Sequence, residues 1–395
     1  MLSQEPTPSI DEKQCDNYTW LSQRAWVEID ISVLRHNMQE LRNFVPLSVE
    51  LMAVVKADAY GHGAITVAQT VLESGASWLG VATVPEGIQL REAGIKAPIL
   101  ILGATYTSEQ IQALAHWNLQ PTLCSPRQAL VFSNTLENYQ YNSPLPVHIK
   151  LDTGMSRLGT NWENAGEFVQ LVHRLPHLKI KSVYSHLATA DDPDPTIMRL
   201  QHSGFEKAIA QIKSLGINPP CLHFANSAAT LSDKALHYDL VRPGLAIYGL
   251  FPAPHLQKVV NLKPVLQVKA RVTQVKNIAA GTGVSYGYKF IAKNDMKIAV
   301  VGIGYADGVP RSLSNKIQVL IHGQRVSQIG TITMDQLMLD VTEISDIQEG
   351  EIVTLLGSQG NEQISADDWA EKLNTISWEI LCGFKHRLPR VAIYH

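Results

Sequence analysis

The sequence predicts an α/β protein in which a closed (β/α)8 barrel is followed by a mainly antiparallel β domain. Three observations predict it: eight short apolar runs between residues 50 and 250, helical patterns between those runs, and alternation of apolar with polar residues after residue 256. Strands that alternate with helices form parallel sheets, and eight such units fit a closed barrel. A doubly wound open sheet is the alternative, because single strand–helix units do not separate the two.

The predicted barrel strands are short, and several are almost continuously apolar, as strands covered on both faces should be. In chain order they are Leu51–Val55, Trp78–Ala82, Pro98–Leu102, Leu119–Cys124, Val147–Leu151, Ile180–Tyr184, Cys221–Phe224 and Leu240–Ile247. The fifth and sixth alternate apolar with polar residues. The sequence therefore places eight strands in the first two thirds of the chain.

Helix signals separate these strands. Pro85 stands in a predicted first helical turn, and Gly94 marks the end of that helix. Ser125 followed by Pro126 is a cap and a first-turn proline, and Asn161 can cap another helix. Each helix lies between two predicted strands, as a barrel requires.

The pattern changes after residue 256. Leu266–Val272 alternates apolar with polar residues, which is typical of half-buried antiparallel strands. Further predicted strands are Lys297–Gly302, Ile317–Ile321, Leu337–Val341 and Glu351–Leu356. We therefore expect a polar tail over residues 1–24, the barrel over 25–256 and the β domain over 257–395.

Composition excludes several classes of function. The net charge is −3 and is spread along the chain, so neither a nucleic-acid partner nor a polybasic membrane anchor is expected. No apolar run has the length of a membrane span, and the polar N-terminus lacks the features of a signal peptide. The fourteen histidines form no HExxH motif, so no metal is expected. Four widely spaced cysteines favour a reducing, cytoplasmic location.

The first chemical signal is Lys56, which directly follows an apolar strand in the string Val54–Gly63. Burial disfavours the ammonium form and lowers the pKa of a lysine, and a partly neutral amine can attack an aldehyde. That chemistry suits a lysine that forms a Schiff base with pyridoxal. From position alone, a lysine that extends from the core to solvent remains the alternative.

The string around Lys56 resembles the pyridoxal-lysine motif of bacterial alanine racemases. Further matches follow in the family's order and run through both predicted domains. They are His148–Gly159, Tyr184–His186, Asn226–Ser227, Val241–Gly244, Val284–Gly287, Gly304–Gly308 and Met334–Gln336. The family combines a pyridoxal-binding barrel with a β domain, which agrees with the pattern of strands.

The resemblance implies pyridoxal 5'-phosphate as the cofactor, held by Lys56. Phosphate binding would fall to Tyr60, Asn226, Ser227 and the backbone of Gly244 and Leu245. Backbone N–H groups at a glycine turn or a helix start suit an anion. Ser227 alone is equally consistent with a helix cap before Ala228.

The resemblance also implies a two-base reaction. Lys56 and Tyr286 would exchange protons on opposite faces of the substrate. Arg242 would face the pyridine nitrogen, and His186 would link Arg242 to Tyr286. In the family the tyrosine reaches the barrel of the other subunit, so a homodimer with shared sites is expected.

Other roles concern the substrate. By resemblance, Arg157 would bind the cofactor's phenolic oxygen and the substrate carboxylate, and the backbone N–H of Met334 would help. Lys150 stands where family members often carry a carbamylated lysine, which can orient Arg157. Lys150 and Asp152 share one strand face by alternation, so Asp152 is the alternative source of negative charge.

The expected reaction is interconversion of L- and D-alanine, supplying D-alanine for cell-wall peptidoglycan. Tyr305, Asp307 and Arg311 are expected near the entrance. The chain departs from the family at His386, where many relatives have a tyrosine, so a wider alanine and serine racemase is one alternative. A barrel-type amino-acid decarboxylase and a non-catalytic pyridoxal carrier are the others; the first would pair the ring nitrogen with an acid, and the second usually lacks the second domain.

Overall fold

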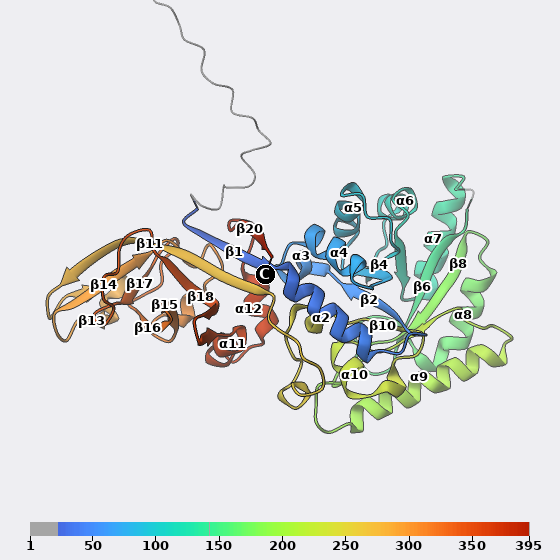
Figure 1. Ribbon diagram of the computed structural model, residues 1–395. Helices are drawn as coiled ribbons and strands as arrows, with labels where there is room; N and C mark the ends of the chain where they lie inside the picture. Colours follow the sequence, from blue (N-terminus) through green and yellow to red (C-terminus); the bar gives the residue numbers. More distant parts are fainter. Residues whose placement is uncertain (1–22, 142, 395) are drawn as a thin grey trace, which may run out of the picture. The chain divides into compact units, whose positions relative to one another are not determined.

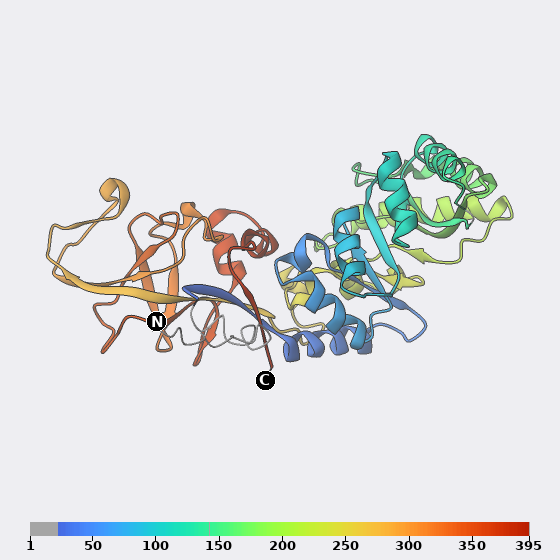
Figure 2. The same ribbon diagram turned by 90° about the horizontal axis from the view of Figure 1, so that it is seen from above.

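The computed structural model describes residues 23–141 and 143–394. These residues divide into two compact units, Ile31–Val265 and the combination of residues 23–30 with residues 266–394. Figure 1 shows helices around a central set of strands in the first unit, and a predominantly stranded second unit. Figure 2 shows the same elements from above.

Eight parallel strands close into a barrel in the first unit. They are β2 (Glu50–Val54), β3 (Trp78–Val81), β4 (Ile99–Ala104), β5 (Gln120–Leu123), β6 (Leu145–Asp152), β8 (Leu178–Tyr184), β9 (Leu222–His223) and β10 (Leu240–Val241). Each pairs with the next along the chain, and β10 pairs back onto β2, where Leu240 is the partner of Glu50. The predicted closed barrel is therefore confirmed, with the short strand β7 (Thr160–Asn161) added beside β6.

Helices alternate with these strands. They are α2 (Ile31–Phe44), α3 (Lys56–Tyr60), α4 (Ala64–Glu73), α5 (Val84–Glu92), α6 (Ser108–His116), α7 (Pro126–Asn138), α8 (Ala165–Arg174), α9 (Thr196–Ser214) and α10 (Ser227–Ser232). Ser125 caps α7 and Pro126 opens it, as predicted. Thr83 and Glu86 form a capping box at the start of α5, which fixes where the chain leaves β3.

One predicted strand is much shorter than expected. The run Leu240–Ile247 pairs as a strand only at Leu240–Val241, and a 3-10 helix follows at Leu245–Tyr248. Pro243 lacks the N–H that a strand ladder needs, and Gly244 adopts φ −118° and ψ −80°, which is outside strand geometry. The interruption leaves Arg242 and Gly244 at the end of a barrel strand.

A second sheet runs through the C-terminal part of the chain. Its strands are β11 (Leu266–Ile278), β14 (Met296–Val301), β15 (Gln318–Ile321), β16 (Gln324–Ile329), β17 (Leu337–Asp340), β18 (Ile352–Gln359), β19 (Glu362–Ile364) and β20 (Arg390–Ile393), joined by β1 (Ala25–Asp30). Most pairs are antiparallel, as predicted. A small hairpin, β12 (Gly283–Val284) with β13 (Phe290–Ile291), and helices α11 (Ala366–Leu373) and α12 (Ser377–Gly383) complete the described part.

Strand β1 lies in this second sheet, whereas residues 25–30 are expected in the barrel. It pairs antiparallel with β11, Ala25 opposite Ala270, and parallel with β20. All six residues of β1 are buried. A buried strand fits either sheet, so the composition of β1 does not indicate to which sheet it belongs. Residues 1–22 of the expected tail lie outside the described residues, and Arg24 forms a bidentate ion pair with buried Asp307. Within the described part of the chain, no helix is long and apolar enough to cross a membrane.

Candidate active site

The predicted cofactor residues of the first unit follow the carboxyl ends of barrel strands. Lys56 follows β2, His186 follows β8, Ser227 follows β9 and Arg242 follows β10. In a closed parallel barrel these ends form one rim, where the active sites of such folds lie. Hydrogen bonds join Arg242 to His186 and Ser227 to Gly244, so the structure brings these positions together at the rim.

Lys56 opens a left-handed helical turn. Ala57, Asp58, Ala59 and Tyr60 all have φ between 53° and 55°. Left-handed backbone costs an L-residue roughly 1–2 kcal/mol, so four in succession require compensation from their surroundings. Small side chains at Ala57 and Ala59 limit the crowding.

Two carboxylates hold this turn. Glu86 accepts the Ala57 N–H at 2.8 Å through Oε1, and its Oε2 accepts the Ala82 and Thr83 N–H groups. Asp58 accepts the Ala64 N–H at 2.7 Å, which ties the turn to the start of α4. These charge-assisted bonds offset the backbone cost and fix the direction in which Lys56 and Tyr60 leave the strand.

The Tyr60 hydroxyl lies against the turn at Gly244, which follows β10, the strand next to β2 in the barrel. We call this turn, with Ser227 and Tyr60, the cradle. A Cβ built on Gly244 would stand 2.8 Å from the Tyr60 hydroxyl, so only glycine admits that approach. Ser227 Oγ accepts the N–H groups of Gly244 at 2.9 Å and of Ala246 at 3.2 Å. Two hydroxyls thus converge on a glycine turn.

Neighbouring backbone completes the cradle. Asn226 caps α10 through the Ala229 N–H, and Leu245 opens the 3-10 helix directly after Gly244. Helix starts and glycine turns present N–H groups that suit a phosphate. The residues present therefore fit the phosphate end of pyridoxal phosphate, and Lys56 follows the neighbouring strand β2.

Arg242 is buried, and its guanidinium is held by several acceptors. Nη2 donates to the carbonyls of Ser185 at 2.8 Å and Phe224 at 3.2 Å, and to His186 Nδ1 at 3.2 Å. Nη1 donates to His223 Nδ1 at 3.0 Å. Burial lowers the pKa of Arg242 to about 10, so the group stays cationic at neutral pH.

These contacts determine where the histidine protons lie. A guanidinium offers only donors, so Nδ1 of His186 and of His223 must accept, and a neutral ring then carries its proton on Nε2. Burial, and next the charge of Arg242, hold the pKa of both rings well below the usual range. His186 consequently presents an N–H donor on the side away from Arg242.

Lys150 is buried beside this group. Burial first, and the charge of Arg242 next, lower the pKa of Lys150 to about 7, so its neutral amine forms far more readily than that of an ordinary lysine. Its ammonium lies 5.1 Å from the centre of the Tyr184 ring. Asp152, the alternative source of charge, accepts the N–H groups of Gly154 and Ser156 in the loop that leads to exposed Arg157.

Tyr286 and Met334 belong to the second unit and lie on neighbouring loops there. Thr331 Oγ1 donates to the Tyr286 carbonyl at 2.8 Å, and Ser285 Oγ donates to the Thr331 carbonyl at 2.7 Å. The N–H of Ala306 donates to the Met334 carbonyl at 3.0 Å. Tyr286 is 71% exposed and Met334 53%, so neither side chain is packed within its own unit.

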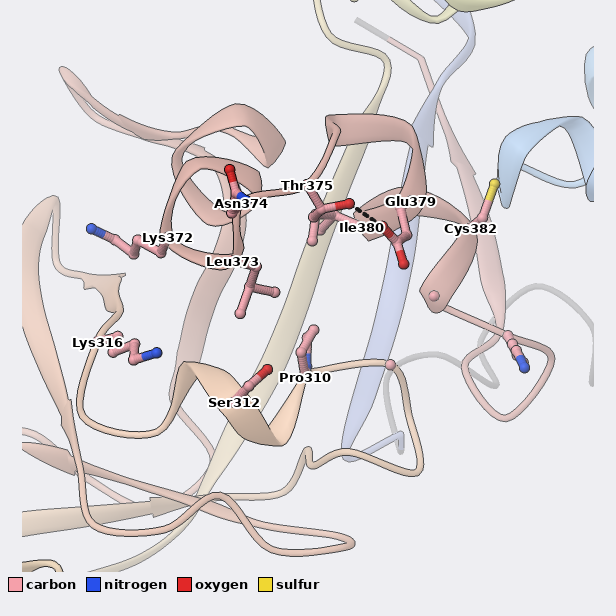
Figure 3. A pocket seen from close by; sticks show the side chains of 13 residues that line it. Pro310, Ser312, Lys316, Lys372, Leu373, Asn374, Thr375, Glu379, Ile380 and Cys382 are labelled. Carbon is pink, nitrogen blue, oxygen red and sulfur yellow. Dashed lines mark hydrogen bonds between the residues drawn. The ribbon is translucent and has the colours of Figure 1, made fainter.

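The second unit also contains an open groove of about 890 Å³ (Figure 3). Lys316 and Lys372 lie on one side of it, and Thr375 donates a hydrogen bond to Glu379 on another. None of the predicted cofactor or substrate residues is among the described residues that line it. Tyr286 and Met334 therefore do not line this groove.

Sequence reasoning missed several residues of the site. Glu86 follows Pro85 in the predicted first helical turn, and no sequence pattern shows that it holds the left-handed turn after Lys56. His148, Ser182 and His223 are buried polar residues inside barrel strands. The available signal was their position in short apolar strands, where a polar side chain needs a partner.

An amine at a strand end, a glycine cradle for phosphate and a buried arginine on one barrel rim define a class: barrel-type enzymes that bind pyridoxal phosphate through lysine. Family models agree. That for the N-terminal domain of alanine racemase matches residues 29–252, and that for the C-terminal domain matches residues 265–392. The chain belongs to the alanine racemase family.

Individual relatives cover almost the whole chain. The alanine racemase of a Nostoc species is 74% identical, over 96% of this chain and 99% of the relative. That of a Synechocystis species is 60% identical over 94% and 100%. A crystal structure of alanine racemase from Bacillus anthracis with bound L-Ala-P is similar with a TM-score of 0.88 and 36% identity, covering 94% of this chain and 95% of that one.

Proposed function

We propose that this chain interconverts L-alanine and D-alanine with pyridoxal phosphate as its cofactor. Family membership supplies the reaction, and the observation that carries it to this chain is Lys56 on the same rim as the Gly244 cradle and Arg242. Bound pyridoxal phosphate withdraws electrons from the α-carbon of an amino acid, so that its proton can be removed. The protein must then bind, orient and exchange that proton.

Lys56 holds the cofactor and serves as the base on one face of the substrate. The left-handed turn fixes its direction. Tyr60, Asn226, Ser227 and the backbone of Gly244 and Leu245 hold the phosphate, supported by the hydroxyls and the helix start that meet there. Rigid anchoring at both ends orients the reacting carbon toward the amine.

Arg242 would donate a hydrogen bond to the ring nitrogen of a bound cofactor. Because guanidinium has only donors and stays cationic, Arg242 would keep that nitrogen unprotonated. Arg242 would thereby limit how strongly the cofactor withdraws electrons and favour rapid return of the proton to the α-carbon. An acid at this position would favour the decarboxylase alternative.

Tyr286 is the base for the opposite face and acts in the site of a partner copy, so the working enzyme is a homodimer. Its 71% exposure within its own chain supports this, since a second copy would cover it. The N–H on Nε2 of the partner subunit's His186 would donate to the Tyr286 oxygen and orient it toward the substrate. Mixing inactive Tyr286→Phe and Lys56→Ala subunits should restore activity in the heterodimer; absence of any recovery would count against shared sites.

Arg157 and the Met334 N–H bind the substrate carboxylate, and Lys150 takes up carbon dioxide to orient Arg157. The neutral fraction of the Lys150 amine supports this last role. His386, at the position of the family tyrosine, is exposed. A second candidate function, racemisation of both alanine and serine, rests on His386 in place of the family tyrosine.

The decisive assay follows D-alanine formed from L-alanine by the purified holoenzyme, beside L-serine at matched concentration. We expect alanine to be turned over faster. Exchange of the α-proton into deuterated water without release of carbon dioxide separates racemisation from decarboxylation, and binding without exchange would indicate a carrier.

In the cell we place this reaction in the cytoplasm, where D-alanine would serve cell-wall peptidoglycan. Fractionation of the producing cell tests the location.

A further inference from the structure

A chain of hydrogen bonds leads from Arg242 into the barrel interior. Arg242 Nη1 contacts His223 Nδ1 at 3.0 Å, and His223 Nε2 contacts Ser182 Oγ at 2.7 Å. Ser182 Oγ contacts His148 Nδ1 at 2.6 Å, and His148 Nε2 contacts Gln120 Oε1 at 2.8 Å. The four residues after Arg242 stand on β9, β8, β6 and β5, which are successive neighbours in the barrel.

Only one arrangement of protons satisfies every member. Arg242 can only donate, so His223 accepts on Nδ1 and donates from Nε2 to Ser182. The Ser182 hydroxyl then donates to His148 Nδ1, and His148 donates from Nε2 to the carbonyl oxygen of Gln120. Both rings are neutral, and every hydrogen bond points away from the guanidinium.

The surroundings keep these rings neutral. His148, Ser182 and His223 are each 1% exposed. Burial first, and the charge of Lys181 next, lower the pKa of His148 to about 3. Burial also lowers the pKa of His223, and electrostatic interactions with Arg242, His148 and Lys150 lower it further. No acid is among the groups that shift either ring, so protonation would place an unbalanced charge in the barrel.

A barrel interior is normally filled by branched apolar side chains. A buried polar chain adds stability only when each member is satisfied, and a single deletion leaves an unpaired donor or acceptor. Tyr184 stacks on His223 at 4.6 Å between ring centres and fixes the plane of that ring. The chain is therefore arranged to deliver one acceptor, His223 Nδ1, to one face of Arg242.

We propose that Ser182 and His148 are positioning residues for Arg242, which act by locking His223 in the tautomer whose Nδ1 accepts from the guanidinium. Loss of the lock frees His223 to place its proton on Nδ1, where it would oppose the Arg242 N–H and displace the guanidinium. The consequence for catalysis rests on the proposed function, in which Arg242 faces the cofactor ring. The tautomer assigned to His223 does not depend on the proposed function.

The first test observes the tautomer directly. Protein labelled with ¹⁵N-histidine, both with and without pyridoxal phosphate, should give nitrogen shifts of a neutral ring protonated on Nε2 for His148 and His223. Assignment uses His148→Asn, whose side-chain oxygen can still accept from Ser182. In Ser182→Ala the His223 signals should move toward a mixture of tautomers. Protonation of His223 on Nδ1 in the unmutated protein would overturn the proposal.

The second test compares matched variants of the holoenzyme. Ser182→Ala and His148→Leu remove the lock, and His148→Asn keeps its acceptor. The control, Thr70→Val, removes a buried hydroxyl of α4 that donates to the Thr66 carbonyl at 2.9 Å and does not belong to the chain of hydrogen bonds. We expect kcat for alanine to fall about tenfold in the first two variants, by analogy with the loss of contacts that support metal ligands, with KM nearly unchanged. The near-visible absorbance of the bound cofactor should shift in the same two variants, whereas His148→Asn and Thr70→Val stay near the unmutated enzyme.

An equal loss in Thr70→Val would show general damage to the core and overturn the positioning role. A Ser182→Ala enzyme with unchanged kcat and absorbance would also overturn it. If the unmutated protein shows the proposed tautomers but forms no D-alanine, the proposed function fails while the lock stands. If it racemises alanine and Ser182→Ala behaves like Thr70→Val, the lock fails while the function stands.

Discussion

The Tyr60 hydroxyl lies where a side chain on residue 244 would have to go: a Cβ on Gly244 would stand 2.8 Å from that oxygen and 3.4 Å from Val54 Cβ. Gly244 has φ −118°, a value open to any residue, so the need for glycine is one of space and not of backbone freedom. The contact joins the ends of β2 and β10 and shapes the cradle assigned to phosphate.

Gly244→Ala should therefore weaken binding of pyridoxal phosphate about tenfold, equivalent to about 1.4 kcal/mol, because Tyr60 must move aside. Titration of the apoenzyme measures the affinity. The double variant Tyr60→Phe with Gly244→Ala should lose less than the sum of the single changes, since the clashing oxygen is gone. Strictly additive losses would show that the two residues do not share the cradle.

Ala57→Gly should stabilise the protein, contrary to the usual effect of glycine. Ala57 has φ 54° and ψ 50°, and relief of left-handed strain is worth roughly 1 kcal/mol. The matched control Ala113→Gly, within α6, should lose about 1 kcal/mol. Thermal unfolding of both variants measures the difference, and a destabilised Ala57→Gly enzyme would contradict the left-handed turn after Lys56.

Lys150 should bind carbon dioxide at a pH where other lysines do not. The pKa of Lys150 is lowered to about 7, so its amine is mostly neutral above pH 7 and mostly charged below it. Occupancy should rise between pH 6 and pH 8.5 at a fixed concentration of dissolved carbon dioxide. Carbon NMR with ¹³C-labelled carbon dioxide should show a carbamate signal that Lys150→Ala lacks; a spectrum identical in the two proteins would remove this role.

Acid should destabilise the barrel through His148. In the unfolded chain a histidine has a pKa of about 6.5, whereas in the fold the pKa of His148 is about 3. The contribution is fully present above pH 6.5 and is lost as pH falls toward 3, because only the unfolded chain then binds the proton. The loss is at most about 1.4 kcal/mol per pH unit for one ring.

Denaturant unfolding at pH 7, 6 and 5 gives the slope for the unmutated protein and for His148→Asn, which keeps a hydrogen-bond acceptor but does not titrate. The variant should show a shallower decline of unfolding free energy. Equal slopes would mean that His148 is not the buried neutral ring described here.

Patterns of apolar residues were sufficient for the barrel and most strands of the second sheet, because each strand carries its own period. They could not place β1, since six buried residues suit either sheet and only pairing with β11 and β20 decides. Pro243 and Gly244 end the predicted strand Leu240–Ile247 after Val241. The sequence contains this local signal, but the continuous apolar run around it favoured a longer strand. The roles of Lys56 and Arg242 came from family resemblance, whereas the link from Arg242 to His223, Ser182 and His148 depends on contacts between distant strands that no local pattern contains.

The proposed function requires that the Lys56 amine at the end of β2 holds the cofactor. Borohydride reduction of the protein loaded with pyridoxal phosphate, followed by digestion and mass spectrometry, identifies the lysine that holds it. We predict a single phosphopyridoxyl adduct on the peptide that contains Lys56, and no near-visible cofactor absorbance or adduct in Lys56→Ala. An adduct on another lysine such as Lys150, or full racemase activity in Lys56→Ala, would contradict the account.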